Sequence, residues 1–150
     1  MTIHLSEDRR KFIKEDYSRG FIAYCGMEAV LVEPGRVEAR LRLRPEHRQQ
    51  DGFAHAGVMA TIADHTAGYA AYTLVPEDHR ILTIEFKINM LRPVVGEEIL
   101  CRGTVIKPGR RVLVCESEVI DQREHGAVLA AKAQLTMASV HQNDLSPAGP

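Results

Sequence analysis

The chain has 150 residues, 45% hydrophobic and 26% charged, with a formal net charge of -1. This size and composition predict one globular domain over residues 1–150, and the near-neutral charge argues against a nucleic-acid binder. The polar stretch from Met1 to Lys14 lacks the apolar core of a secretory signal, and Asp64 and His65 interrupt the longest apolar stretch, so no membrane span is expected. Three scattered cysteines without a CxxC motif argue against a disulfide framework or zinc site, and favour a cytoplasmic protein.

The first third of the chain predicts a helix and two strands. Ser6 can cap a helix over residues 7–19. Residues 26–32 predict a first strand, and Pro34-Gly35 a turn. From Val37 to Leu43 apolar and charged residues alternate, and this period of two is typical of a half-buried strand.

An alanine- and glycine-rich stretch follows the polar loop over residues 45–52. No proline interrupts residues 57–75, and alanine is the strongest helix former, so we expect one helix of about 17 residues that Pro76 ends. Apolar residues lie on almost every side of this helix, which indicates a buried central position.

The remainder of the chain predicts strands and a polar tail. Four segments show alternation or bounding turns: residues 83–90, 98–107, 111–121 and 129–137. The tail over residues 142–150 is expected to be frayed. The order of helix, two strands, long helix and four strands favours an α+β fold, with one antiparallel sheet wrapped around one helix. A doubly wound parallel sheet does not fit, because helices and strands fail to alternate.

Asp64 is the most informative single residue, because it is a carboxylate in the middle of an apolar helix. Its neighbours three and four positions away are small and include no basic residue: Ala60, Thr61, Ala67 and Gly68. The small neighbours leave a concavity above a carboxylate that has no local partner, and such groups often mark sites of base or nucleophile chemistry. The alternative is a carboxylate that pairs with a distant arginine or lies near solvent.

The residues before the helix have the elements of an oxyanion hole. Free backbone N–H groups at a helix N-terminus favour developing negative charge. The small Ala56 and Gly57 let a ligand carbonyl approach that backbone, and His55 and Gln49 could donate hydrogen bonds nearby. The alternative is a glycine-assisted helix start with His55 as a polar cap.

Together these elements carry a family resemblance. The run His55-x-Gly57-x-x-x-Thr61-x-x-Asp64-x-x-x-Gly68 resembles the active-site stretch of hotdog-fold acyl-CoA thioesterases of the phenylacetate-degradation type. The likeness extends from about Gly20 to Ser139 and includes these shorter motifs: Gly26-Met27-Glu28, Pro34-Gly35-Arg36-Val37, Pro45-Glu46-His47, Arg92-Pro93, Gly96-Glu97 and Gly109-Arg110-Arg111.

The resemblance implies a hotdog fold, hydrolysis of an acyl-CoA thioester and a role for five residues. Asp64 would be the catalytic acid residue, acting as general base or as nucleophile. His55 would lie near the thioester, the Ala56 N–H would polarise its carbonyl, and Thr83 would hold the attacking water. Gln49 stands where the family usually has Asn, and Ala56 where it has the first Gly of His-Gly-Gly. The resemblance further implies a homodimer or homotetramer in which Asp64 of one subunit faces His55 and Ala56 of another. Water and a carboxylate suffice for the reaction, so no cofactor is expected.

A basic turn completes the expected site. Lys107, Arg110 and Arg111 flank Pro108-Gly109, and three cations at a hairpin tip suit the phosphates of a nucleotide. The alternative is an ordinary solvated turn, but the resemblance favours a contact with coenzyme A. Seven histidines without an HxxxH or HExxH motif argue against a metal site.

Two other functions remain open at this point. An acyl-thioester dehydratase on the same fold would use a histidine and an acid on the carbons next to the thioester. A non-catalytic acyl-CoA binding or sensor protein would keep the pocket and lose the acid, so Asp64 argues against it.

Overall fold

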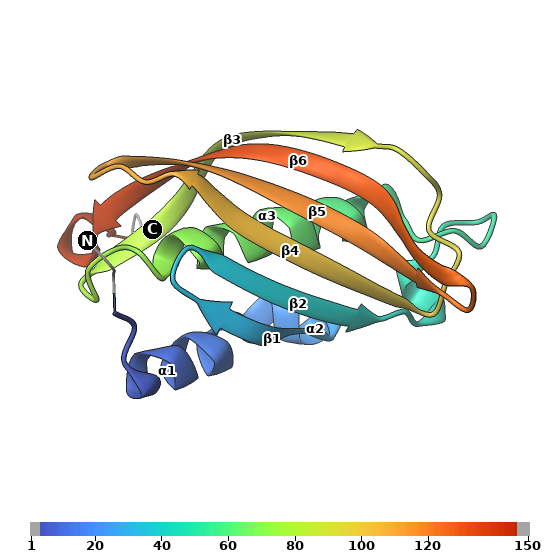
Figure 1. Cartoon of the computed structure of the whole chain (residues 1–150), viewed down its shortest axis with the longest axis horizontal. Helices are drawn as coiled ribbons and strands as arrows, with labels where there is room; N and C mark the ends of the chain where they lie inside the picture. Colours follow the sequence, from blue (N-terminus) through green and yellow to red (C-terminus); the bar gives the residue numbers. More distant parts are fainter. Residues whose placement is uncertain (1–3, 147–150) are drawn as a thin grey trace.

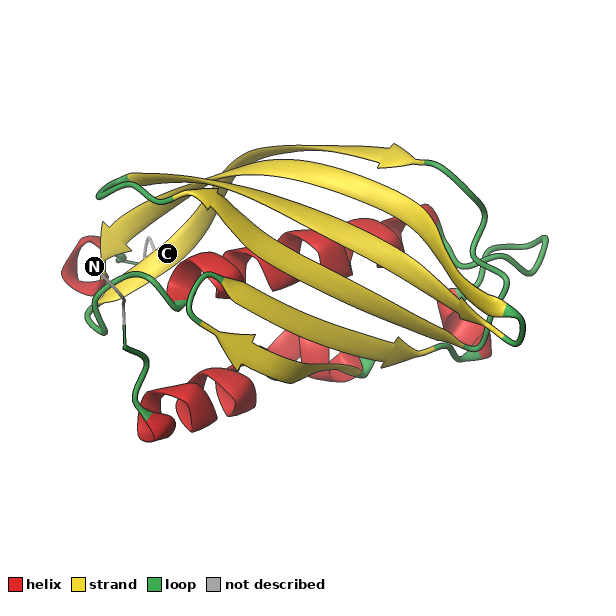
Figure 2. Ribbon diagram, in the orientation of Figure 1, coloured by secondary structure: helices red, strands yellow, loops and turns green. Residues whose placement is uncertain are grey.

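The computed structural model describes residues 4–146 and consists of a curved antiparallel sheet wrapped around one long helix (Figures 1 and 2). The elements in chain order are α1 (Glu7–Tyr17), α2 (Gly20–Cys25), β1 (Met27–Glu33), β2 (Arg36–Arg42), the 3₁₀ turn η1 (Pro45–His47), α3 (Ala56–Tyr72), β3 (His79–Met90), β4 (Glu98–Lys107), β5 (Val112–Arg123), β6 (Gly126–His141) and the 3₁₀ turn η2 (Gln142–Asp144). The strand order is β1-β2-β4-β5-β6-β3. This is the α+β hotdog arrangement that the sequence predicted.

Helix α3 lies in the concave side of the sheet and has the predicted 17 residues. One face packs on the sheet, with Ile62, Ala63 and Ala67 fully buried. The sheet approaches so closely at Gly103 that a Cβ there would lie 2.7 Å from the backbone of Thr66. The opposite face, which carries Asp64, is only half-buried. The helix is therefore not buried on almost every side, as its composition had suggested.

Both ends of the described chain differ from the sequence prediction. The first helix ends at Tyr17 rather than near residue 19, because the Ser18 N–H turns back to the Glu15 carbonyl and Gly20 has a φ of +54°. A second short helix, α2, then occupies residues for which the sequence predicted no helix or strand. At the other end, residues 142–144 are not frayed but form η2, where the Gln142 N–H donates to the Asp78 carbonyl at 2.7 Å. Residues 147–150 of the predicted frayed tail lie outside the described residues.

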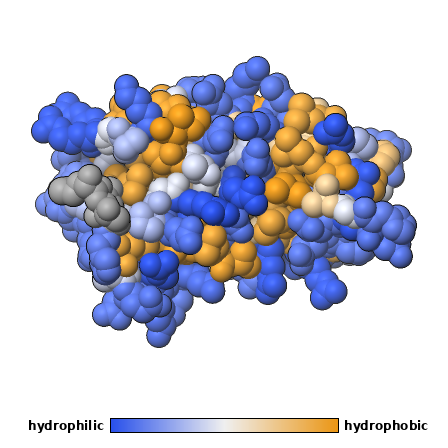
Figure 3. Space-filling model, in the orientation of Figure 1, coloured by the Kyte–Doolittle hydropathy of each residue, from blue (hydrophilic) through white to orange (hydrophobic). Residues whose placement is uncertain are grey.

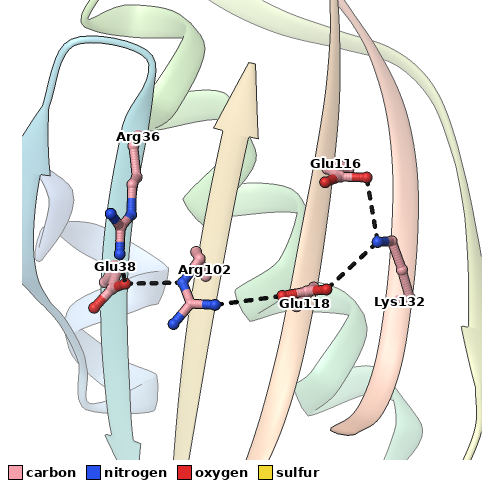
Figure 4. Close-up of polar contacts among 6 residues, drawn as sticks. All are labelled: Arg36, Glu38, Arg102, Glu116, Glu118 and Lys132. Carbon is pink, nitrogen blue, oxygen red and sulfur yellow. Dashed lines mark hydrogen bonds and ion pairs between the residues drawn. The ribbon is translucent and has the colours of Figure 1, made fainter. Parts of the chain in front are cut away.

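The outer face of the sheet carries a row of alternating charges across four strands (Figure 4). Glu38 of β2, Arg102 of β4, Glu118 of β5 and Lys132 of β6 lie directly opposite one another in the strand register. The Arg102 Nε donates to Glu38 at 2.9 Å, and the pKa of the Glu38 carboxyl is lowered because its hydrogen bonds with Arg102 and Arg36 outweigh the opposing effect of burial. Figure 3 shows the resulting hydrophilic band between hydrophobic patches. The charges of this row are neutralised by one another.

Strand β3 forms one edge of the sheet and exposes several large apolar side chains. It pairs only with β6 within the described residues. Leu82, Ile84, Phe86 and Met90 are 46%, 57%, 39% and 41% exposed. Proteins usually protect a strand edge with charges, proline or a covering segment, so exposed apolar side chains at this edge are an unusual feature of the fold.

Candidate active site

The Asp64 carboxylate, on the half-buried face of α3, is hydrogen-bonded to the first strand after the helix. The Thr83 hydroxyl of β3 donates to Asp64 Oδ1 at 2.7 Å. A β-bulge between Thr83 and Glu85 interrupts the register with β6 at this point, and such bulges redirect side chains beside functional sites. Within residues 4–146 no cationic side chain pairs with this carboxylate, and the Thr83 hydroxyl oxygen keeps lone pairs that can accept from water.

Asp64 lies between two pockets. One, of about 350 Å³, is lined by Asp64 with Gly68, Tyr69, Tyr72 and Thr83, among other residues. The other, of about 440 Å³, extends past Ala60 and Thr61 to Phe21 and Phe86. Three of the four small neighbours of Asp64, namely Ala60, Thr61 and Gly68, therefore border this space as their spacing predicted, whereas Ala67 is buried under the sheet.

The start of α3 forms the second part of the candidate site. The His55 ring caps the helix, with Nδ1 accepting from the Gly57 N–H at 2.8 Å. Because Nδ1 is an acceptor, a neutral ring carries its proton on Nε2, which can donate to a ligand. A Cβ on Gly57 would lie 3.0 Å from this Nδ1, so glycine allows the ring to sit close to the backbone. Among the described residues nothing accepts from the Ala56 N–H.

Gln49 shapes the loop that leads into α3. Its side-chain carbonyl accepts from the Asp51 N–H, and the Gly52 N–H donates to the Gln49 backbone carbonyl at 3.0 Å. Gln49 lines a pocket of about 480 Å³ together with His55, Ala56 and Met90. The side-chain amide of Gln49 thus borders the same space as the free Ala56 N–H.

The structure brings the candidate residues together in two groups rather than one. Asp64 and Thr83 form the first group, and Gln49, His55, Ala56 and Gly57 form the second. Ala56 and Asp64 are eight residues apart on one helix, which separates them by about 12 Å along its axis. No single thioester carbonyl can contact both groups of one chain. Both groups lie beside β3, because Thr83 borders the first pocket and Met90 the second.

The basic turn between β4 and β5 lies at the end of the sheet where β3 begins and β6 ends. Arg110 and Arg111 line a pocket of about 480 Å³ with His79, His141 and Asp144. Lys107 is exposed at the end of β4 and is not among the residues lining that pocket. A Cβ on Gly109 would lie 2.1 Å from the Val112 carbonyl oxygen, so this tight turn requires glycine.

Sequence reasoning missed the residues that anchor the N-terminal helix beside Asp64. The Tyr69 hydroxyl donates to Asp16 at 2.8 Å, and the His65 Nε2–H donates to the Tyr17 carbonyl at 2.9 Å. Burial lowers the pKa of His65, which favours the neutral form of its ring. Asp16, His65 and Tyr69 all line the smaller pocket at Asp64. Nothing in the sequence marks Asp16, which is one of several acidic residues on a polar helix.

Two structural observations bear on other kinds of site. In residues 4–146, no three or more His, Cys, Asp or Glu side chains are arranged to hold a metal ion. None of the helices in this described range is long and apolar enough to cross a membrane.

Comparison with known proteins identifies the family. The sequence profile of the thioesterase superfamily matches residues 51–134. A thioesterase family protein from Silicibacter pomeroyi is 32% identical, with a TM-score of 0.83 over 86% of this chain and 96% of that one. A conserved protein from Pseudomonas aeruginosa is 31% identical, with a TM-score of 0.76 over 85% and 98%. The 1,4-dihydroxy-2-naphthoyl-CoA hydrolase of Listeria monocytogenes is 26% identical over 99 residues, or 66% of this chain and 80% of that protein. The profile match spans more than half of the chain and contains both groups of candidate residues except Gln49, and the chain therefore belongs to the thioesterase superfamily.

Proposed function

We propose that the protein hydrolyses an acyl-CoA thioester in a site built from two subunits. The observation that carries this proposal is that one helix bears both the Asp64 carboxylate and the Ala56 N–H, of which the first has no cationic partner and the second no acceptor among the described residues. Thioester hydrolysis needs both a base or nucleophile and a donor for the developing oxyanion. The named CoA hydrolase among the relatives supports coenzyme A as the thiol.

The apolar edge of β3 supports a dimer that unites the two groups. Antiparallel pairing of β3 with its copy around a two-fold axis would extend the sheet and bury Ile84 and Phe86. The same axis would set the two α3 helices antiparallel, so that Asp64 of each subunit faces the Ala56 end of the other. Each dimer would then hold two complete sites.

The chemistry at such a site has two balanced forms. As a general base, Asp64 takes a proton from a water that Thr83 orients, and the water oxygen bonds to the thioester carbon. The carbonyl oxygen becomes negative opposite the Ala56 N–H and the His55 Nε2–H. The C–S bond then breaks, and the departing thiolate takes up the proton. As a nucleophile, Asp64 instead bonds to the carbonyl carbon and expels the thiolate, and water hydrolyses the resulting mixed anhydride.

The remaining candidate residues would bind rather than react. Gln49 lies beside the Ala56 N–H and can donate its amide to the thioester or to water. Arg110 and Arg111 would engage coenzyme A phosphates at the sheet end.

A thiol-release assay over acetyl-, hexanoyl-, palmitoyl-, benzoyl- and phenylacetyl-CoA tests this function. We expect turnover of at least one thioester by the wild type and a loss of two or more orders of magnitude in kcat for Asp64→Asn, with near-normal KM. Wild-type kcat in that variant would remove Asp64 from the mechanism. Hydration of an enoyl-CoA without thiol release would indicate a dehydratase instead, and binding without turnover would indicate a sensor.

Single turnover in H₂¹⁸O tests for the anhydride. Incorporation of ¹⁸O into Asp64 is expected only if Asp64 forms the anhydride and water attacks the Asp64 carbonyl carbon of that intermediate. Label in the free acid alone is expected both for general base catalysis and for attack of water on the acyl carbonyl carbon of the anhydride, so label in Asp64 is the decisive result.

A further inference from the structure

Asp121, a buried carboxylate on β5, has no place in the chemistry described above. It continues the core-facing row of that strand after Leu113, Cys115, Ser117 and Val119, and its side chain is 0% exposed. Its two oxygens accept three hydrogen bonds: Oδ2 from the Val95 N–H at 3.0 Å and the Arg123 Nε at 2.7 Å, and Oδ1 from the Gly96 N–H at 3.0 Å. A buried charge is tolerated only when it is paired and hydrogen-bonded, and this one is fully engaged.

All three donors lie in, or are hydrogen-bonded to, the segment between β3 and β4. Val95 and Gly96 donate directly, and Arg123 donates its Nη2 to the Pro93 carbonyl at 2.9 Å. A Cβ on Gly96 would lie 2.5 Å from the Asp121 Oδ1, so the close contact requires glycine at that position. The segment from Pro93 to Gly96 is therefore held from the β5 side at three of its four residues, namely Pro93, Val95 and Gly96.

The fourth residue of this segment, Val94, connects it to the loop that precedes α3. Its carbonyl accepts from the Ala54 N–H at 3.1 Å, and both Val94 and Ala54 are buried. Ala54 is two residues before Ala56. The Arg48 guanidinium spans the same gap, donating to the Gly52 carbonyl at 3.0 Å and the Gly96 carbonyl at 2.9 Å. The loop that presents the Ala56 N–H thus rests on a segment that Asp121 fixes.

We propose that Asp121 is a positioning residue that sets the place of the Ala56 N–H through Val94 and Ala54. This inference rests on the proposed function, because it assigns the Ala56 N–H to the thioester oxyanion. Helix α3 alone does not fix that N–H, since Ala56 lies at its first turn, where the preceding loop determines the backbone direction. A displacement of about 1 Å at a reacting group can reduce the rate about 100-fold.

The test compares Asp121→Asn with a control of similar burial far from both groups of site residues. Asparagine is nearly isosteric but turns one acceptor oxygen into an NH₂ that faces donors. The control is Thr73→Val at the end of α3. Thr73 is 3% exposed, and its hydroxyl accepts from the Gly35 N–H at 2.7 Å. Both variants lose a buried acceptor, so both should lower Tm by several degrees.

Three readouts separate positioning from plain stability. For Asp121→Asn we expect kcat on the best thioester of the panel to fall about 10- to 100-fold with KM within about twofold, because an oxyanion contact strengthens in the transition state. We expect faster hydrogen exchange at the Ala54 and His55 amides, which donate to Val94 and His47. Thr73→Val should leave kcat and this exchange unchanged. Arg48→Lys keeps the charge but cannot span two carbonyls, so it should lower kcat and speed exchange as Asp121→Asn does. Because Arg48 is only half-buried, this variant should fold normally.

Several outcomes would overturn the inference. Wild-type kcat in Asp121→Asn at a lowered Tm, or an equal fall of kcat in Thr73→Val, would make Asp121 an ordinary stabilising residue. Unchanged exchange at Ala54 and His55 in both Asp121→Asn and Arg48→Lys would disprove the mechanical link. Failure of the wild type on every thioester would refute the proposed function and with it the catalytic purpose of the link, whereas the exchange data would still decide whether Asp121 holds the loop.

Discussion

Gly68 stands in the middle of α3, where a glycine costs helix stability without an evident backbone reason. A Cβ at this position would meet only the Met137 Cε, at 3.9 Å, which is ordinary van der Waals contact. Alanine is more favourable than glycine in a helix interior by about 0.8–1 kcal/mol. A domain of this size gains about 2–4 °C in Tm per kcal/mol, so Gly68→Ala should raise Tm by about 2–4 °C.

The same methyl group should impair activity, because Gly68 lines the pocket beside Asp64. If that pocket receives the acyl group, the methyl removes room next to the reacting carbon. One methyl group of misfit costs about 1–3 kcal/mol in a shaped pocket, or roughly 10- to 200-fold in kcat/KM. The ratio of kcat/KM for phenylacetyl-CoA to that for acetyl-CoA should therefore fall by about tenfold or more.

Melting curves at one fixed protein concentration and a two-substrate kinetic comparison check both halves of this prediction. Gly103→Ala is the matched control, because its Cβ would lie 2.7 Å from the backbone of Thr66 and should destabilise the fold. A lowered Tm in Gly68→Ala would contradict the packing argument. An unchanged substrate ratio would show that the acyl group does not occupy this pocket.

Three further predictions concern the basic turn, the loop before α3 and a buried histidine. Replacing Arg110 and Arg111 by alanine should raise KM for CoA thioesters more than it lowers kcat, an effect that salt weakens; equal impairment on a short thioester without the nucleotide would exclude phosphate binding. Gln49→Ala should lower kcat/KM about tenfold, and unchanged kinetics in this variant would exclude Gln49 from the site. Gln49→Asn should retain activity, because an asparagine carbonyl can also accept from the backbone N–H two residues on, as Gln49 does from Asp51. Burial lowers the pKa of His65, so the unfolded chain takes up its proton first and the protein loses stability as pH falls below about 6.5. His65→Gln should therefore reduce the difference in Tm between pH 7.5 and pH 5.5, and an unchanged difference would contradict the role of this residue.

The parts of the fold with strict periodicity could be predicted from sequence, and the parts set by tertiary contacts could not. Alternation located β2 and β6, and the uninterrupted alanine-rich stretch located α3 with its correct length. By contrast, α2 has only six residues, and it owes its helical form to packing on β1 rather than to propensity. The same limit explains why the half-exposed face of α3 was not foreseen, since it depends on which side the sheet covers.

The candidate site shows a similar division. Asp64 could be found because a lone carboxylate contradicts the apolar helix around it. Its hydrogen bond to Thr83 depends on how β3 returns over the helix, which no spacing rule gives, so only the family resemblance indicated Thr83. Asp121 carried a signal that could have been used: a carboxylate that falls in the core-facing positions of an alternating strand.

The strand order has a consequence for how the protein is made. Strand β3 leaves the ribosome directly after α3, but its only partner within the described residues is β6, and Thr83 lies opposite Met137, 54 residues further along the chain. At a synthesis rate of about 5–20 residues per second, this segment waits several seconds as an unpaired apolar strand. The register that places Thr83 opposite Met137 can therefore form only after β6 has been made. The strand that carries Thr83 is made early but gains its partner in the sheet last.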